Sequence, residues 1–129
     1  AANGAGVILV DTSVWIDHLR SDDAGLKEHL QAGRVLSHPF VIGELALGNL
    51  RGRQVILVAL QDLPQANTAT DPEVMRFIAS HQLYGLGIGY VDAHLLAAVR
   101  LTPGASLWTR DKRLREVASR LGVAGNPPY

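Results

Sequence analysis

Four acidic residues stand in surroundings that favour chemistry over ordinary solvation. Asp11 directly follows a short β-branched apolar run, and Asp111 closely follows a second apolar run near the end of the chain. Glu44 lies inside a strongly apolar segment, where an ionised carboxylate is costly to bury without a partner. Asp92 stands just before another apolar segment. These settings single out the four carboxylates as candidates for one functional site.

The chemistry open to such a set is cation binding. Clustered carboxylates repel one another, and a bound cation makes the cluster tolerable at neutral pH. The chain has no Cys, so an oxygen-only site predicts a hard cation, Mg²⁺ or Mn²⁺.

Each acid also has a simpler interpretation. Asp11, Asp92 and Asp111 could each be a helix N-cap, because Asp is a favoured residue at that position. Glu44 could lie on a solvated helical stripe that includes Asn49 and Arg51. Taken singly, none of the four is diagnostic, and it is their occurrence together that predicts a site.

The elements that must position these acids alternate between strands and helices. Apolar runs predict strands at 7–10, 35–36 and 105–108. Helical spacing of apolar residues and end signals predict helices after residue 11 and at about 23–31, 40–50, 52–63, 71–83, 91–101 and 112–121. A helix start is predicted at Asp71-Pro72-Glu73, with Asp71 as its N-cap. Three glycines, Gly85, Gly87 and Gly89, predict a loop.

Strands separated by helices predict an α/β fold with a parallel sheet and right-handed crossovers. In such sheets the active crevice lies outside the carboxyl ends of the strands. Asp11 and Asp111 both follow strands, so the topology predicts that these two carboxylates meet at one edge.

The bulk properties suit one compact domain. The 129 residues are 47% hydrophobic, which is enough for a core, and no apolar run approaches the roughly 20 residues that span a bilayer. We expect a flexible lead over 1–6, a single domain over 7–129, and no membrane association. No signal peptide is recognisable and Cys is absent, so the expected location is the cytoplasm. The formal net charge of zero argues against purely non-specific nucleic-acid binding.

Four short motifs resemble, in order, those of PIN domains, and especially the VapC toxins of bacterial toxin–antitoxin pairs. The first is Val-Asp-Thr-Ser-Val-Trp-Ile at 10–16, and the second is Ile-Gly-Glu-Leu at 42–45. The third is Tyr-Val-Asp-Ala at 90–93, and the fourth is Leu-Trp-Thr-Arg-Asp-Lys-Arg-Leu at 107–114. The resemblance spans about residues 7–123, and it implies a PIN-like three-layer fold with a mostly parallel central sheet flanked by helices.

The resemblance also implies an activity and its partners. It implies an endoribonuclease that cuts RNA phosphodiester bonds through water activated by Mg²⁺ or Mn²⁺, a homodimer, and a cognate VapB-like antitoxin that blocks the site. Carried over by position, the metal-binding and catalytic acids would be Asp11, Glu44, Asp92 and Asp111. Thr12 and Thr109 would be hydroxyls that orient carboxylates or waters.

Other residues carry weaker signals. The five histidines form no metal-spacing pair, and structural or surface roles are expected for them. Trp15 and Trp108 have apolar neighbours and are expected in the core. Ser13 has no nearby His to activate it and is expected to be a capping hydroxyl. A basic group beside the site either grips RNA phosphates or forms a solvated helix face. It consists of Arg110, Lys112, Arg113 and Arg115.

Two alternatives from other classes remain. A non-catalytic PIN fold that binds RNA or acts as a scaffold should have lost acids, whereas this chain keeps all four. A phosphotransfer domain also places acids at strand ends, but a receiver domain needs an adjacent acidic pair, and Thr12 follows Asp11 here. Dehalogenase-type phosphatases need an Asp two residues past the first, where this chain has Ser13.

Overall fold

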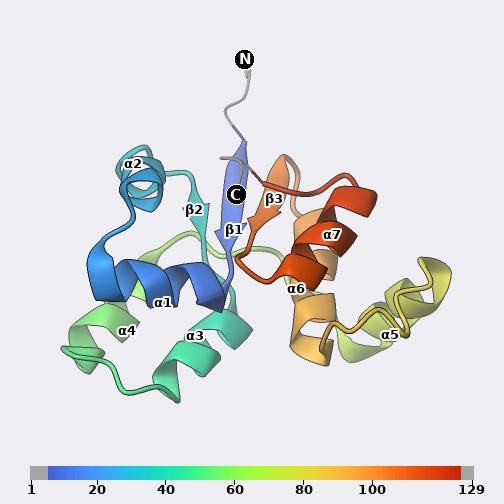
Figure 1. Cartoon of the computed structure of the whole chain (residues 1–129), viewed down its shortest axis with the longest axis horizontal. Coiled ribbons are helices and arrows are strands. Elements are labelled where there is room, and N and C mark those ends of the chain that lie inside the picture. The colour runs from blue at the N-terminus through green and yellow to red at the C-terminus, as the bar shows by residue number, and fades with distance from the viewer. Residues whose placement is uncertain (1–5, 126–129) are drawn as a thin grey trace.

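A computed structural model describes residues 6–125, so all but Gly6 of the expected flexible lead lies outside the described residues. Three parallel strands form the sheet in the order β2-β1-β3. They are β1 (Val7–Val10), β2 (Val35–Leu36) and β3 (Ala105–Trp108). The three arrows in Figure 1 run the same way, toward the region between α1, α3, α6 and α7. The predicted strands and their parallel arrangement are confirmed.

Helices flank the sheet on both sides, with α7 in front of α6 and both packed on β3 (Figure 1). This arrangement confirms the expected α/β fold. Seven helices occur in the described part of the chain: α1 (Thr12–Ser21), α2 (Ala24–Gln31), α3 (Pro39–Ala46), α4 (Arg53–Asp62), α5 (Asp71–Ser80), α6 (Tyr90–Leu101) and α7 (Lys112–Arg120).

Two of the predicted helices are too long. Helix α3 ends at Ala46, short of the expected position 50, because the poor helix formers Gly48 and Asn49 follow its C-cap residue, Leu47. Helix α5 ends at Ser80, since Gln82 adopts a φ of 54° that no right-handed helix accommodates.

The cap assigned to α5 was also wrong. Thr70 occupies the N-cap position, and its hydroxyl accepts a hydrogen bond from the Glu73 backbone N–H at 3.3 Å. The Glu73 carboxylate in turn accepts from the Thr70 N–H at 2.7 Å, which completes a capping box. Asp71 is therefore the first helical residue, and its side chain is free to contact α6.

The core lies between the sheet and the helices. Leu9 and Val10 of the central strand are fully buried, and the two tryptophans, Trp15 and Trp108, are buried as expected. An all-apolar β1 is what a central parallel strand covered on both faces requires. No helix within residues 6–125 is both long and apolar enough to cross a membrane.

The carboxyl ends of the strands lead directly into helix starts. Asp11 is the N-cap of α1, immediately after β1, and Asp111 is the N-cap of α7, three residues after the end of β3. His38, two residues after the end of β2, is the N-cap of α3. Because the strands are parallel, these helix starts meet at one edge of the sheet, and this edge holds the candidate site.

Candidate active site

Asp11 is buried at the end of β1 and is held by two hydroxyls. Its side chain Oδ2 accepts hydrogen bonds from Ser13 Oγ at 2.7 Å and from Thr109 Oγ1 at 2.8 Å. Its backbone N–H donates to the Trp108 carbonyl at 2.9 Å, which fixes the residue against β3. Asp11 occupies the N-cap position of α1, but its side chain makes no capping bond to the helix and is directed to these hydroxyls instead.

Thr109 joins Asp11 to Asp111. The buried Thr109 hydroxyl donates to Asp11 and accepts from the Asp111 backbone N–H at 3.0 Å. The Asp111 side chain accepts from the Leu114 N–H at 3.1 Å, which confirms its capping role. That bond occupies Oδ1 of Asp111, so the cap leaves the second carboxylate oxygen for another ligand.

Glu44 reaches the same edge from α3. Its Oε1 accepts a hydrogen bond from Thr12 Oγ1 at 2.6 Å, and Thr12 is the first residue of α1, directly after Asp11. Glu44 is exposed, as the solvated-stripe interpretation expected, but it faces the helix that follows β1. It also borders a cleft of about 440 Å³ between α1, α3 and α4.

Asp92 is the carboxylate whose pKa is affected by the charges of the other three acids. It lies in the first turn of α6, where its Oδ2 accepts from the Gly89 N–H at 2.9 Å, so it is not the N-cap residue itself. Burial raises the pKa of Asp92, and the nearby charges of Asp11, Asp111 and Glu44 raise it further. The structure therefore places all four acids in one electrostatic neighbourhood.

The donor set suits a hard divalent cation. These carboxylates accept hydrogen bonds from neutral hydroxyl and backbone N–H donors, which do not neutralise their negative charges. Within residues 6–125 no three acidic or imidazole groups converge tightly enough to form a complete protein cage for a metal. Mg²⁺ is usually held by one or two carboxylates and keeps several waters, so a looser set of oxygens fits it chemically.

Ser13 is not the cap that was expected, because it lies within the first turn of α1, where no side chain caps the helix. Its hydroxyl donates to Asp11 and accepts from the Arg110 backbone N–H at 2.9 Å, so it ties the start of α1 to the segment after β3. The sequence contained a signal for this contact, since a hydroxyl two residues after a strand-end Asp can bond back to that carboxylate. The contact between Ser13 and the Arg110 backbone depends on the tertiary structure, because 97 residues separate the two positions.

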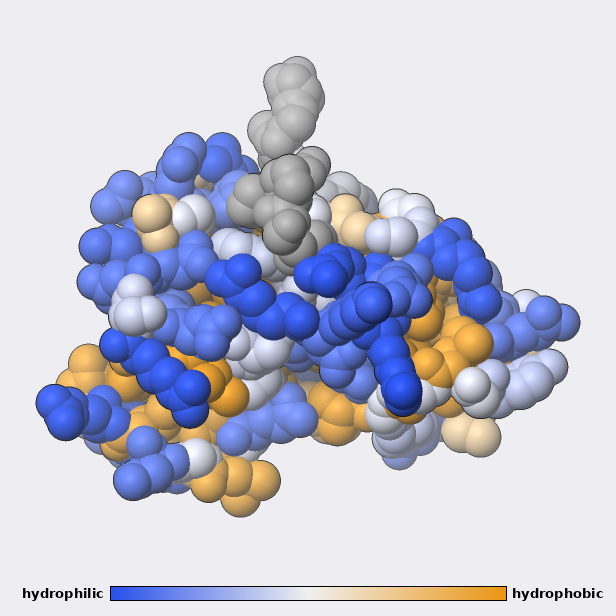
Figure 2. All heavy atoms as spheres, in the orientation of Figure 1, coloured by the Kyte–Doolittle hydropathy of each residue, from blue (hydrophilic) through white to orange (hydrophobic). Residues whose placement is uncertain are grey.

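Arg110 of the basic group is exposed and makes contacts within the protein. Its guanidinium pairs with Asp17 at 3.2 Å and with Asp23 at 2.6 Å, and it lies over the Trp108 ring, 5.6 Å from the centroid. These contacts join β3 to α1 and α2. Lys112 and Arg113 are exposed, and hydrophilic side chains cover the viewed face across α1 and α7 (Figure 2).

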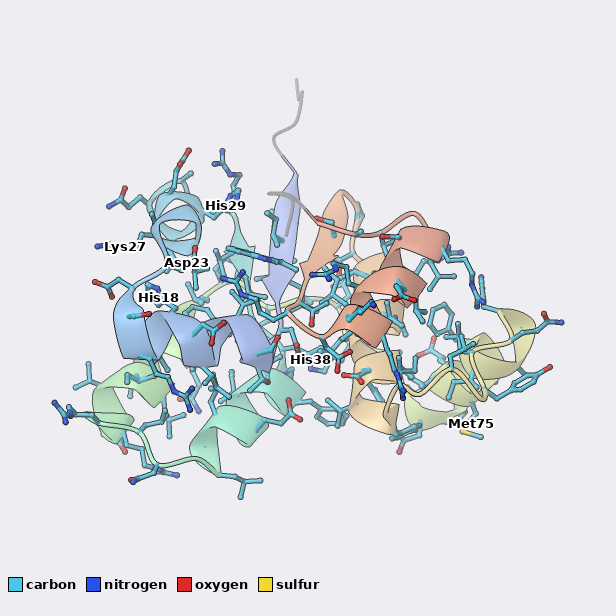
Figure 3. The ribbon with its side chains drawn as sticks, in the orientation of Figure 1. His18, Asp23, Lys27, His29, His38 and Met75 are labelled. Atoms are coloured by element: carbon cyan, nitrogen blue, oxygen red, sulfur yellow. The ribbon has the colours of Figure 1, made fainter. Side chains whose placement is uncertain are left out.

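The histidines have structural roles where contacts are seen. His38 is buried at the centre of the molecule, apart from His18 and His29 (Figure 3), and its Nδ1 accepts from the Phe40 N–H at 3.0 Å. Burial lowers the pKa of His38 to about 4, with a further contribution from the charge of His94. His94 is buried as well, and its Nε2 lies 3.0 Å from Oδ1 of Asp71.

An α/β fold with four acids at the carboxyl edge of a parallel sheet defines the class of protein. Residues 8–120 match the PIN domain family, and the chain belongs to that family. Two relatives match most of the chain, and both are named Ribonuclease VapC32. They come from Mycobacterium tuberculosis strains CDC 1551 / Oshkosh and ATCC 25618 / H37Rv. Each is 51% identical over 118 residues, which covers 92% of this chain and 95% of the relative.

A solved structure supports the fold independently. PAE2754 from Pyrobaculum aerophilum superposes with a TM-score of 0.56 at 17% identity, covering 94% of both chains. At that identity the likeness concerns the fold alone. The resemblance to VapC proteins drawn from the four motifs is confirmed by the matches over most of the chain.

Proposed function

We propose that this protein is a metal-dependent endoribonuclease whose site consists of Asp11, Glu44, Asp92 and Asp111. The observation that carries the proposal is the hydrogen-bonded edge of the sheet, where Thr109 joins Asp11 to Asp111, and the raised pKa of Asp92, due to burial and the nearby acids, supports it. A carboxylate set that repels itself at the edge of a sheet is costly unless it binds a cation. The name of the relatives, Ribonuclease VapC32, supplies RNA as the substrate.

The residues have separate tasks in this proposal. Asp11, buried and held by hydrogen bonds from Ser13 and Thr109, would hold the cation together with Asp92 and Asp111, in part through the waters that Mg²⁺ retains. Glu44, oriented by Thr12, is exposed and would hold or orient the attacking water. A bound Mg²⁺ or Mn²⁺ would lower the pKa of that water and neutralise charge on the phosphate.

The decisive experiment is Asp11→Asn. Asparagine keeps an oxygen that accepts from Ser13 and Thr109 but loses the charge, so the fold should persist. RNA cleavage in Mg²⁺ or Mn²⁺ should fall roughly 100-fold or more, the scale of losing a group that stabilises the transition state. Cleavage is measured on labelled RNA with EDTA as the blank, and circular dichroism checks the fold.

Asp62→Asn is the matched control, because Asp62 is an exposed acid at the end of α4. It should cleave RNA at the wild-type rate. Wild-type activity in Asp11→Asn, or undiminished cleavage in EDTA, would contradict the proposal.

We also propose that residues 7–129 form a single domain and that the protein acts in the cytoplasm. The partners proposed for it are an antitoxin of the VapB type and a second copy of this chain. The cleft beside Glu44 supports the antitoxin, because it combines apolar walls with two arginines at a site residue. Apolar side chains also gather over α3 and α4 in Figure 2. A VapB-like protein encoded beside this gene should suppress RNA cleavage when added in equimolar amount, and unchanged cleavage would argue against the pairing.

A further inference from the structure

The chain between α5 and α6, residues 81–89, leads into the first turn of α6, where Asp92 lies. It ends at Gly89, whose N–H donates to the Asp92 carboxylate at 2.9 Å. Most of this loop is exposed, and Leu83 is its buried anchor in the core. Gly85 and Gly87 have φ values of 73° and 80°, a region open to glycine at little cost. Leu86 and Ile88 of the loop also pack, partly buried, against the core, and contacts from α7 add to this packing.

Two arginines of α7 supply those contacts. Arg113 crosses directly over Gly87: a Cβ added to Gly87 would lie 2.8 Å from Arg113 Cδ and 3.1 Å from Cζ. Arg120 donates from Nη2 to the His81 carbonyl at 2.9 Å, at the other end of the loop. Positions 113 and 120 are seven residues apart, so they share one face of α7 and span the loop.

The position of Arg113 connects this contact to the site. Arg113 stands two residues after Asp111, and Gly87 stands two residues before Gly89, which binds Asp92. The arginine therefore joins the start of α7 to the loop that leads into α6. These are the helices that carry Asp111 and Asp92.

We propose that Arg113 is a positioning residue, which packs over Gly87 to clamp the 81–89 loop on α7 and so sets the separation of Asp92 and Asp111. The proposal rests on the proposed function insofar as those two acids bind a cation. A Cβ at position 87 would occupy the space of the arginine and displace its flexible side chain from the loop. The proposal also assigns Arg113 a role other than an RNA grip or a solvated face.

The test compares two glycines of one loop. Gly87→Ala and Gly85→Ala impose the same kind of backbone strain, but a Cβ at Gly85 meets nothing within 4 Å. Displacing Arg113 in Gly87→Ala should weaken Mn²⁺ binding about 10-fold, the effect of losing a group that orients a metal ligand. Gly85→Ala should leave Mn²⁺ affinity unchanged. Affinity is measured by Mn²⁺ titration with electron paramagnetic resonance.

A second readout needs no metal. Amide hydrogen exchange reports the Gly89 N–H that binds Asp92, and it should be faster in Gly87→Ala than in Gly85→Ala. Equal exchange rates and equal Mn²⁺ affinities in the two variants would overturn the proposal. The exchange result stays interpretable if the wild-type protein neither binds Mn²⁺ nor cleaves RNA, an outcome that would instead defeat the proposed function.

Further variants of Arg113 separate positioning from phosphate binding. Arg113→Ala should weaken Mn²⁺ binding as Gly87→Ala does. The double variant Arg113→Ala/Gly87→Ala should bind Mn²⁺ no more weakly than Gly87→Ala alone, after correction for the effect of backbone strain measured in Gly85→Ala. Arg113→Lys keeps the charge but not the planar group, so it should behave like Arg113→Ala. Wild-type Mn²⁺ affinity in Arg113→Lys, with a flatter salt dependence of RNA binding in Arg113→Ala, would show a phosphate contact and overturn the positioning role.

Discussion

At the scale of single residues, Asp92 is the acid of the site whose ionisation costs the folded protein free energy. Its carboxylate is half-buried and lies near three other acids, and both burial and their charges raise its pKa. The single hydrogen bond from the Gly89 N–H opposes that rise without cancelling it. A residue in this position destabilises the folded protein at neutral pH unless a cation is bound.

Asp92→Asn should therefore stabilise the protein when divalent cations are removed. Asparagine still accepts from Gly89 but carries no charge. Because the folded pKa is raised, ionisation of Asp92 costs stability above that pKa, and the cost disappears as pH falls through it. Chemical denaturation in EDTA at pH 7 should show a higher free energy of unfolding for the variant, and the gain should shrink at acid pH. A less stable Asp92→Asn at pH 7, with Asp62→Asn unchanged, would contradict this.

His38 makes an opposite contribution to pH dependence. The unfolded chain should bind a proton at the ordinary pKa of 6.5, whereas burial holds the folded value near 4. Stability should consequently fall as pH drops from about 6.5 to about 4, by up to about 3 kcal/mol. His38→Asn keeps an acceptor for the Phe40 N–H but does not titrate, so its stability should fall less steeply over this range.

The control for that measurement is His18→Asn. His18 Nδ1 accepts from the Asp23 N–H at 2.9 Å, an equivalent bond in a less buried position. Urea denaturation at a series of pH values compares the two variants. Equal acid slopes for His38→Asn and the wild type would rule out His38 as the source.

At the scale of the elements, helix α5 is held by contacts at its start as well as by packing. Its main partner is α6, against which Val74 is fully buried. Beyond that packing, Asp71 at its start accepts from the Tyr90 hydroxyl at 2.8 Å and lies against His94. The capping box at Thr70 thus places the residue that joins α5 to α6.

Thr70→Ala should remove the cap and lower the free energy of unfolding by about 1 kcal/mol, the usual effect of losing an N-cap hydroxyl. Thr68→Ala, an exposed threonine of the same loop, is the matched control and should have little effect. Thermal or urea denaturation measures both. Equal stabilities for the two variants would show that the capping box contributes nothing to α5.

At the scale of the whole molecule, the site joins segments from both ends of the chain. Asp11 and Thr109 are 98 residues apart and share a buried hydrogen bond of 2.8 Å. The acids can meet only when the sheet and its crossovers are complete. Cation binding should consequently be coupled to folding, since the unfolded chain has no such cluster.

Mn²⁺ or Mg²⁺ should therefore raise the unfolding temperature of the wild-type protein. A ligand at 100 times its dissociation constant stabilises the folded state by about 2.7 kcal/mol. Differential scanning fluorimetry over a range of Mn²⁺ concentrations measures the shift. Asp11→Asn should show little or none of it, while Asp62→Asn should match the wild type. An equal shift in Asp11→Asn would place the cation elsewhere.

The sequence by itself determined the pieces that depend on local rules. Apolar runs predicted the three strands, helical spacing predicted the helices, and the four motifs predicted the family and supplied the candidate acids. Strand-end position alone predicted that Asp11 and Asp111 would meet. Helix ends were less accurate, because the cap at Thr70 and the positive φ at Gln82 depend on competing local geometries.

Only the tertiary structure decided how the pieces meet. It turned Asp11 from a possible cap into a buried carboxylate held by hydroxyls from both ends of the chain. It also showed that Arg110 forms two ion pairs and that the Arg113 side chain packs over Gly87. These contacts join residues far apart in the chain, and no local pattern specifies which distant side chain fills a given space. Chain periodicity predicts which residues face a partner, but the packed sheet determines which partner they meet.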